Sequence, residues 1–116
     1  AADALMAMVT SNAARIIRAP AAGRLAVGAP ADLVVLPAAA KGGAAAALLA
    51  ARRGDVQLVM IDGQPLLGAP RFAAAFTARQ RTTRPLTVDG AGRLMDAVLA
   101  RRVAACPIEE PGVHLM

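Results

Sequence analysis

The amino-acid sequence predicts an α+β fold, because two short helical segments open the chain and a β-branched run and a strong hairpin signal follow. In the hairpin, the apolar runs Val56–Ile61 and Gln64–Leu67 flank Asp62-Gly63, a pair suited to the two positive-φ positions of a tight turn. One hairpin and one other strand make an incomplete sheet. We therefore expect additional strands to complete it.

Apolar residues at helical spacing predict a first helix over Ala1–Val9 and a short second helix over Ala13–Arg18. The capping residues Thr10–Asn12 join the two, and Pro20 stops the second. The sequence starts inside the first helix and has no initiator Met there. This start fits either removal of the initiator Met or a chain cut out of a longer one.

The middle of the chain is expected to contain a loop, a strand and a helix. The loop Gly23–Pro30 leads into the continuous apolar run Ala31–Leu36, which is typical of a short strand covered on both faces. A flexible lead then precedes an Ala/Leu helix within Ala38–Arg53, which Gly54 closes.

Residues 71–116 are expected to form a helical extension. A small helix follows the hairpin, Leu86–Val88 is extended, and Asp89-Gly90 turns into a last helix over Arg93–Ala104. Residues 108–116 are expected to be a tail.

The composition predicts a thin core. Hydrophobic residues make up 57% of the 116 residues, but 31 are alanine, which buries little area, and Trp and Tyr are absent. No apolar run reaches the roughly 20 residues that a membrane span needs. The single cysteine, Cys106, has no partner for an internal disulfide. We expect a cytoplasmic protein with no membrane partner.

The net charge of +5 comes mainly from arginine, since Lys41 is the only lysine among thirteen basic residues. These residues are scattered along the chain, with pairs at Arg52–Arg53 and Arg101–Arg102. A nucleic-acid interface usually needs a focused basic face with stacking aromatic side chains. We therefore expect no nucleic-acid partner.

Three motifs in order give the sequence a family resemblance. Met8–Ile17 (MVTSNAARII) resembles the helix–turn–helix that follows the barrel in amidohydrolase-superfamily enzymes. Gly23–Leu36 (GRLAVGAPADLVVL) is similar to the return into their small β-sandwich, and Val56–Leu66, which contains VMIDGQP, is similar to its closing hairpin. The resemblance covers roughly residues 1–70.

The resemblance implies a fragment of a (β/α)8-barrel hydrolase. Residues 1–18 would be the last barrel-associated helices, residues 19–70 the C-terminal share of a composite β-sandwich, and residues 71–116 an extension. The missing sandwich strands would come from the N-terminal segment of the parent. The parent would hold zinc or another divalent metal on barrel histidines, a lysine or glutamate and an aspartate. It would hydrolyse C–N bonds of a small non-peptide amide, cyclic amide or amidine.

We expect no catalytic, cofactor or metal site in this chain itself. A catalytic zinc site needs about three protein ligands, whereas the chain has one histidine, His114, and one cysteine, Cys106. Asp3 lies on a helix too close to Thr10 to match the barrel aspartate of the family. Asp32 is the most tempting carboxylate, but we expect it to accept backbone N–H bonds at the start of a strand.

The remaining candidates are interpreted as structural. Thr10 and Ser11 have no His or Asp partner for nucleophilic activation and are read as helix caps. Gly23, Gly28 and Gly42-Gly43 lack the strand–GxxxxGK–helix context of a phosphate loop.

The leading hypothesis is thus a structural C-terminal portion of an amidohydrolase. Its partners would be the rest of the barrel and the N-terminal sandwich strands, with oligomerisation left open. The alternative is a stand-alone interaction module, or a pseudo-enzyme remnant, that binds a protein partner through its hairpin edge and basic helix.

Overall fold

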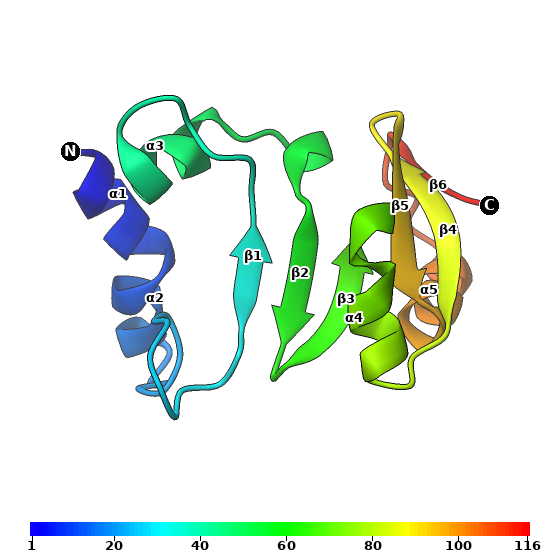
Figure 1. The fold of residues 1–116 in the computed structure, drawn as a ribbon, viewed down its shortest axis with the longest axis horizontal. Helices are drawn as coiled ribbons and strands as arrows, with labels where there is room; N and C mark the ends of the chain where they lie inside the picture. Colours follow the sequence, from blue (N-terminus) through cyan, green and yellow to red (C-terminus); the bar gives the residue numbers. More distant parts are fainter.

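The computed structural model describes all residues 1–116 and confirms the α+β class. A single antiparallel sheet carries helices near both of its ends (Figure 1). The sheet has six strands in the order β1-β2-β3-β5-β4-β6. The strands are β1 Leu33–Val35, β2 Leu58–Ile61, β3 Gln64–Gly68, β4 Thr83–Val88, β5 Ala91–Asp96 and β6 Val113–Leu115.

The predicted hairpin is confirmed as β2–β3. Asp62 and Gly63 have φ values of 50° and 71°, the paired positive values that a two-residue turn needs to match the twist of the strands. Asp89 and Gly90, with φ values of 50° and 82°, make an equivalent turn between β4 and β5. The expectation that Asp89-Gly90 leads directly into a helix is therefore wrong.

The prediction of a helical extension over residues 71–116 is also wrong in its secondary structure, since three of the six strands lie there. Arg93–Asp96 belongs to β5, and the helix α5 begins only at Ala97 and runs to Ala105. β5 lies between β3 and β4. Leu94 and Met95 at the end of β5 continue the apolar pattern of α5, so in the sequence they read as the first turn of that helix.

The additional strands that we expected to complete the sheet include three from this same chain, β4, β5 and β6. Leu67 of β3 pairs with Met95 of β5, and Gly68 pairs with Leu94, so the C-terminal strands extend the sheet beyond the first hairpin. The N-terminal segment of a longer chain is not needed to continue the sheet on this side. The opposite edge, β1, is paired only with β2.

β1 is more exposed to solvent than the sequence predicts. The continuous apolar pattern predicts cover on both faces, but the side chain of Val34 in the middle of the strand is 56% exposed. β1 is an edge strand whose close packing partner is β2, and no helix packs closely on it.

The helices fall into two groups. At the start of the chain, α1 (Ala2–Val9) packs against α2 (Ser11–Ile16) and against α3 (Gly43–Ala50). The short turn Pro70–Phe72 leads into α4 (Ala73–Ala78), which packs on β3, while α5 packs on β4 and β5. α3 is shorter than the predicted helix, and Gly54 lies in a separate turn, Arg53–Asp55. No helix has both the length and the apolar character that a membrane span requires.

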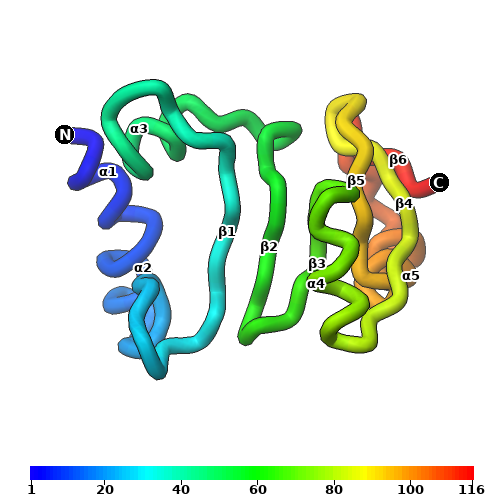
Figure 2. The backbone as a smooth tube through the Cα atoms, viewed as in Figure 1, coloured from blue at the N-terminus to red at the C-terminus, as the bar shows by residue number.

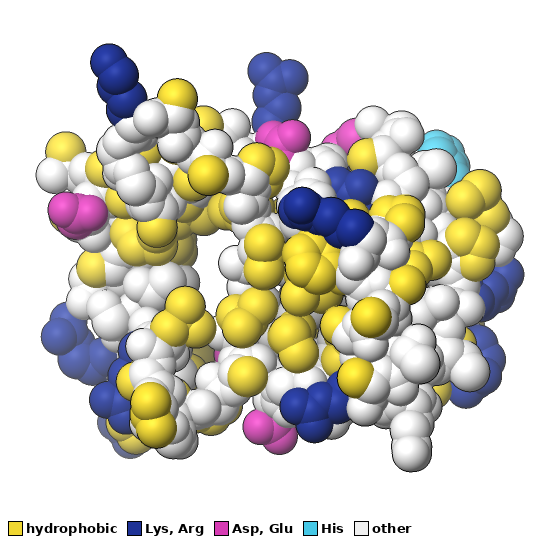
Figure 3. All heavy atoms as spheres, in the orientation of Figure 1, with side chains coloured by type: hydrophobic (Ala, Val, Ile, Leu, Met, Phe, Trp, Pro, Cys, Tyr) yellow, Lys and Arg dark blue, Asp and Glu magenta, His cyan; other side chains and the backbone are white.

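The N-terminal helices stand away from the sheet. The backbone trace places α1 and α2 at the end of the molecule opposite the C-terminus (Figure 2), and the space-filling view shows an opening between them and the β1–β2 region, rimmed by hydrophobic atoms (Figure 3). The radius of gyration is 15.2 Å, larger than the about 13 Å expected for a compact chain of this length. The fold is therefore open on its N-terminal side.

Burial is correspondingly uneven. Fourteen of 116 residues are buried, and only Ala14 and Ala45 among them precede Leu58. The main core cluster is formed by Leu86, Val88, Met95 and Ala100. The hydrophobic effect thus stabilises the C-terminal half, whereas the N-terminal half buries only two alanines, which contribute little.

We predict that Leu86→Ala lowers the free energy of unfolding by about 2–5 kcal/mol, because the Leu86 side chain is fully buried and its loss leaves a cavity. In the isolated chain Leu49→Ala is the matched control, since Leu49 on α3 is 55% exposed there and its loss should change stability by less than about 0.5 kcal/mol. Urea denaturation measures both. Equal effects of the two substitutions would contradict the assignment of the core.

Candidate functional site

The histidine and the cysteine lie on the C-terminal half and are not brought together with other metal ligands. His114 is an exposed residue of β6 opposite Thr87, and Cys106 is an exposed residue at the end of α5. No group of three His, Cys, Asp or Glu side chains is close enough to hold a metal ion. The donor set that the family would need for zinc does not fit the residues of this chain.

The hydroxyl residues near the start of the chain serve the helices. Thr10 separates α1 from α2, as the sequence predicts, but its hydroxyl donates back to the Met6 carbonyl at 2.8 Å and does not cap α2. Ser11 is the first residue of α2, and Asp3 lies in the first turn of α1. Only the Thr10 side chain bonds a backbone group, and no hydrogen bond joins Thr10, Ser11 and Asp3 to one another.

Asp32 has the structural role that the sequence suggests, with a partner that is distant in sequence. Its Oδ1 accepts a hydrogen bond from the backbone N–H of Asp62 at 2.7 Å, and the N–H of Gly63 donates to the Ala31 carbonyl at 3.1 Å. The segment before β1 is thereby fixed to the β2–β3 turn. No second acid or base faces this carboxylate through a hydrogen bond or an ion pair.

The densest polar cluster centres on Arg53, which in the sequence stands out only as one of a basic pair with Arg52. Its guanidinium donates to both carboxylate oxygens of Asp89, at 3.0 and 2.5 Å, and also to Glu110 at 2.5 Å. A further bond goes to the Pro111 carbonyl at 2.7 Å. The hydrogen bonds from Arg53 lower the pKa of Asp89 below its ordinary value of 3.8, and its carboxylate in turn raises the pKa of Arg53.

A second arginine, Arg93, is 8% exposed and bonds only to backbone carbonyls. It donates to Gly54 at 2.6 Å, to Val56 at 2.8 Å and to its neighbour Gly92 at 2.8 Å. Arg93 on β5 and Arg53 in the turn Arg53–Asp55 therefore tie the segment before β2 to the C-terminal part of the chain. The role is structural, because every acceptor in contact with Arg93 is a backbone carbonyl of this chain.

The third cluster joins Arg81 to Asp96, whose side chain is only 4% exposed, at 3.2 Å. Asp96 also accepts from the backbone N–H groups of Val98 and Leu99, at 3.0 and 3.1 Å, and so caps α5. An Asp just before a helical pattern is the signal that could have located this helix start. The helix start was missed because Leu94 and Met95, directly before Asp96, extend the apolar pattern into β5.

We predict that Asp32→Ala lowers the free energy of unfolding by about 1 kcal/mol, since it removes the acceptor for the Asp62 N–H. Asp32→Asn keeps an acceptor oxygen and should retain most of the stability. Thermal or urea denaturation distinguishes the two. If Asn were as damaging as Ala, the charge of Asp32 and not its hydrogen bond would be the important property.

We predict that Asp89→Asn lowers the free energy of unfolding near neutral pH and has a smaller effect in acid. Because the folded-state pKa of Asp89 is lowered, its contribution is present above the unfolded value near 3.8 and is lost as the pH falls through the folded pKa. The gap between wild type and Asp89→Asn should be constant near neutrality and shrink below about pH 4. Urea midpoints across this range measure it, with Glu109→Gln as an exposed control that shows no such gap.

The comparisons with known proteins identify the family. No curated protein and no solved structure matches the chain. The Amidohydrolase family matches residues 1–66, which contain α1 to α3 and β1 and β2 and reach into β3. The match covers more than half of the 116 residues and includes the three motifs that carry the resemblance. This chain belongs to the amidohydrolase family.

Proposed function

We propose that this chain is a structural, non-catalytic portion of an amidohydrolase that acts on C–N bonds of small amides, cyclic amides or amidines. In this proposal α1 and α2 pack against the catalytic barrel, and β1 to β3 form part of a composite β-domain beside it. The divalent metal would be held by barrel residues, where it would activate water. The residues of the present chain position that barrel and do not bind the metal.

The observation that carries the proposal is the apolar surface of the family-matched segment. Fourteen large hydrophobic side chains are exposed, and ten of them lie within residues 1–66. These ten are Leu5, Met8, Val9, Ile16, Ile17, Leu25, Val27, Val34, Leu49 and Ile61. So many exposed apolar side chains in a segment with almost no core of its own are typical of a surface that is covered by another part of a protein.

The free edge of β1 supports the same arrangement. β1 has no strand partner on the side away from β2, so its backbone groups on that side are open to a further strand. Val34 on β1 is 56% exposed, and the opening in Figure 3 lies on this side of the sheet. An added strand and a packed barrel would cover both features.

The experiment that tests the proposal is isolation of the native protein from its source. A protein that exceeds the 11.7 kDa of this chain by at least a barrel of about 250 residues, binds a divalent metal and hydrolyses a cyclic amide would support it. A native mass of 11.7 kDa without metal would overturn it in favour of the interaction module.

A pair of substitutions tests the interface. In the native protein Val34→Asp should lower stability by about 1–3 kcal/mol, because it places an unpaired charge at a covered position. In the isolated chain the same substitution should have little effect, since Val34 is exposed there. Val103→Asp on α5 is the control, and equal losses for both variants in the native protein would contradict the proposed interface.

A further inference from the structure

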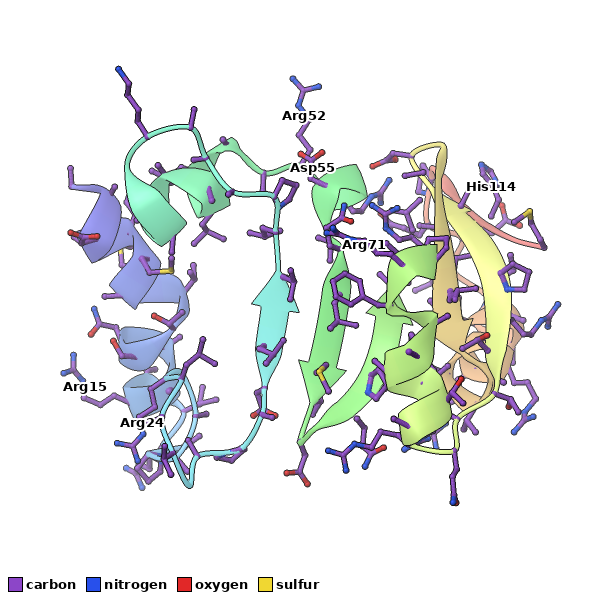
Figure 4. The ribbon with its side chains drawn as sticks, in the orientation of Figure 1. Arg15, Arg24, Arg52, Asp55, Arg71 and His114 are labelled. Atoms are coloured by element: carbon purple, nitrogen blue, oxygen red, sulfur yellow. The ribbon has the colours of Figure 1, made fainter.

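Three arginines line one hollow near the start of the chain. Arg15 and Arg18 come from α2 and the residues directly after it, and Arg24 comes from the following loop. Arg15 and Arg24 lie at the same end of the N-terminal part (Figure 4). The hollow has a volume of about 440 Å³, and its other lining residues are Ser11, Ala14, Pro20 and Ala22.

These three guanidinium groups have no carboxylate partner. The sequence contains no acidic residue between Asp3 and Asp32, and the ion pairs of the structure involve only Arg53 and Arg81. Arg15 donates one hydrogen bond, to the side-chain oxygen of Asn12 at 3.2 Å. Like charges around one hollow repel each other unless an anion lies between them.

The backbone holds the segments that carry the three exposed arginines close together. The loop approaches α2 closely at Gly23, where an added Cβ would lie 2.6 Å from the Thr10 carbonyl oxygen. The N–H of Ala19 donates to the Ala14 carbonyl at 2.8 Å, which closes the turn after α2. Arg18 has a φ of 56°, a left-handed conformation that glycine usually occupies after a helix. Arginine is thus placed here at a local conformational cost.

We propose that this hollow binds a small multivalent oxyanion, such as the phosphate group of a small molecule. Guanidinium groups present planar pairs of N–H donors that match phosphate oxygens, and each stays charged at every physiological pH. The Ser11 hydroxyl on the same lining can donate a further bond. Every group that the proposal uses lies within this chain, so the isolated chain tests it separately from the proposed hydrolase function.

Isothermal titration of the chain with inorganic pyrophosphate, at constant ionic strength, tests the proposal. We expect saturable binding to the wild type and an affinity at least about tenfold weaker for the double variant Arg18→Gln/Arg24→Gln, because two charge-assisted contacts are lost. The control Arg101→Gln/Arg102→Gln removes the same charge from exposed positions of α5 and should bind pyrophosphate as the wild type does. Circular dichroism verifies that both variants are folded.

Three results would overturn the proposal. Equal weakening in both double variants would mean that net charge alone attracts the anion. No binding of pyrophosphate to the folded wild type would mean that the hollow is not an oxyanion site. Binding of a single-stranded oligonucleotide in the absence of pyrophosphate binding would mean that the arginines recognise an extended nucleic-acid backbone, with the steep salt dependence of such contacts.

Discussion

The short pairing of β3 with β5 holds the molecule together. It joins only two residue pairs, Leu67 with Met95 and Gly68 with Leu94, yet it unites the family-matched segment with the C-terminal strands in one sheet. Phe76, which is 1% exposed, covers this junction. An added Cβ on Gly68 would lie 3.1 Å from the Phe76 ring and 3.3 Å from the Leu58 side chain, so a side chain there would crowd both. The arginine contacts across the same boundary depend on this alignment.

An element of this fold could be predicted when its signal is local in the sequence, and could not when it depends on a distant pairing. The β2–β3 hairpin could be predicted because Asp62-Gly63 sits between two apolar runs, so the signal is local. The β4–β5 hairpin uses the same turn chemistry at Asp89-Gly90, but the apolar residues after it fit a helix as well as a strand. The segment is a strand because it pairs with β4 along its whole length and with β3, about 28 residues earlier, at its end.

The polar clusters could likewise be predicted only where the signal is local. The structural role of Asp32 could be inferred from its position before a strand, but its partner, Asp62, could not. Arg53 and Arg93 gave no signal, because arginine is frequent in this sequence and their partners are mostly backbone carbonyls or acids far along the chain. The grouping of Arg15, Arg18 and Arg24 depends on how closely the loop at Gly23 folds onto α2. Such long-range geometry is not encoded in any short motif.

The end of the family match has a consequence for where the stability of the chain lies. The match ends at residue 66, inside β3, and the pairing with β5 begins at Leu67. The turn of the β2–β3 hairpin lies within the matched segment, whereas the core cluster of Leu86, Val88, Met95 and Ala100 lies wholly beyond it. A chain cut at the end of the match would therefore keep its hairpin turn and lose its main hydrophobic core.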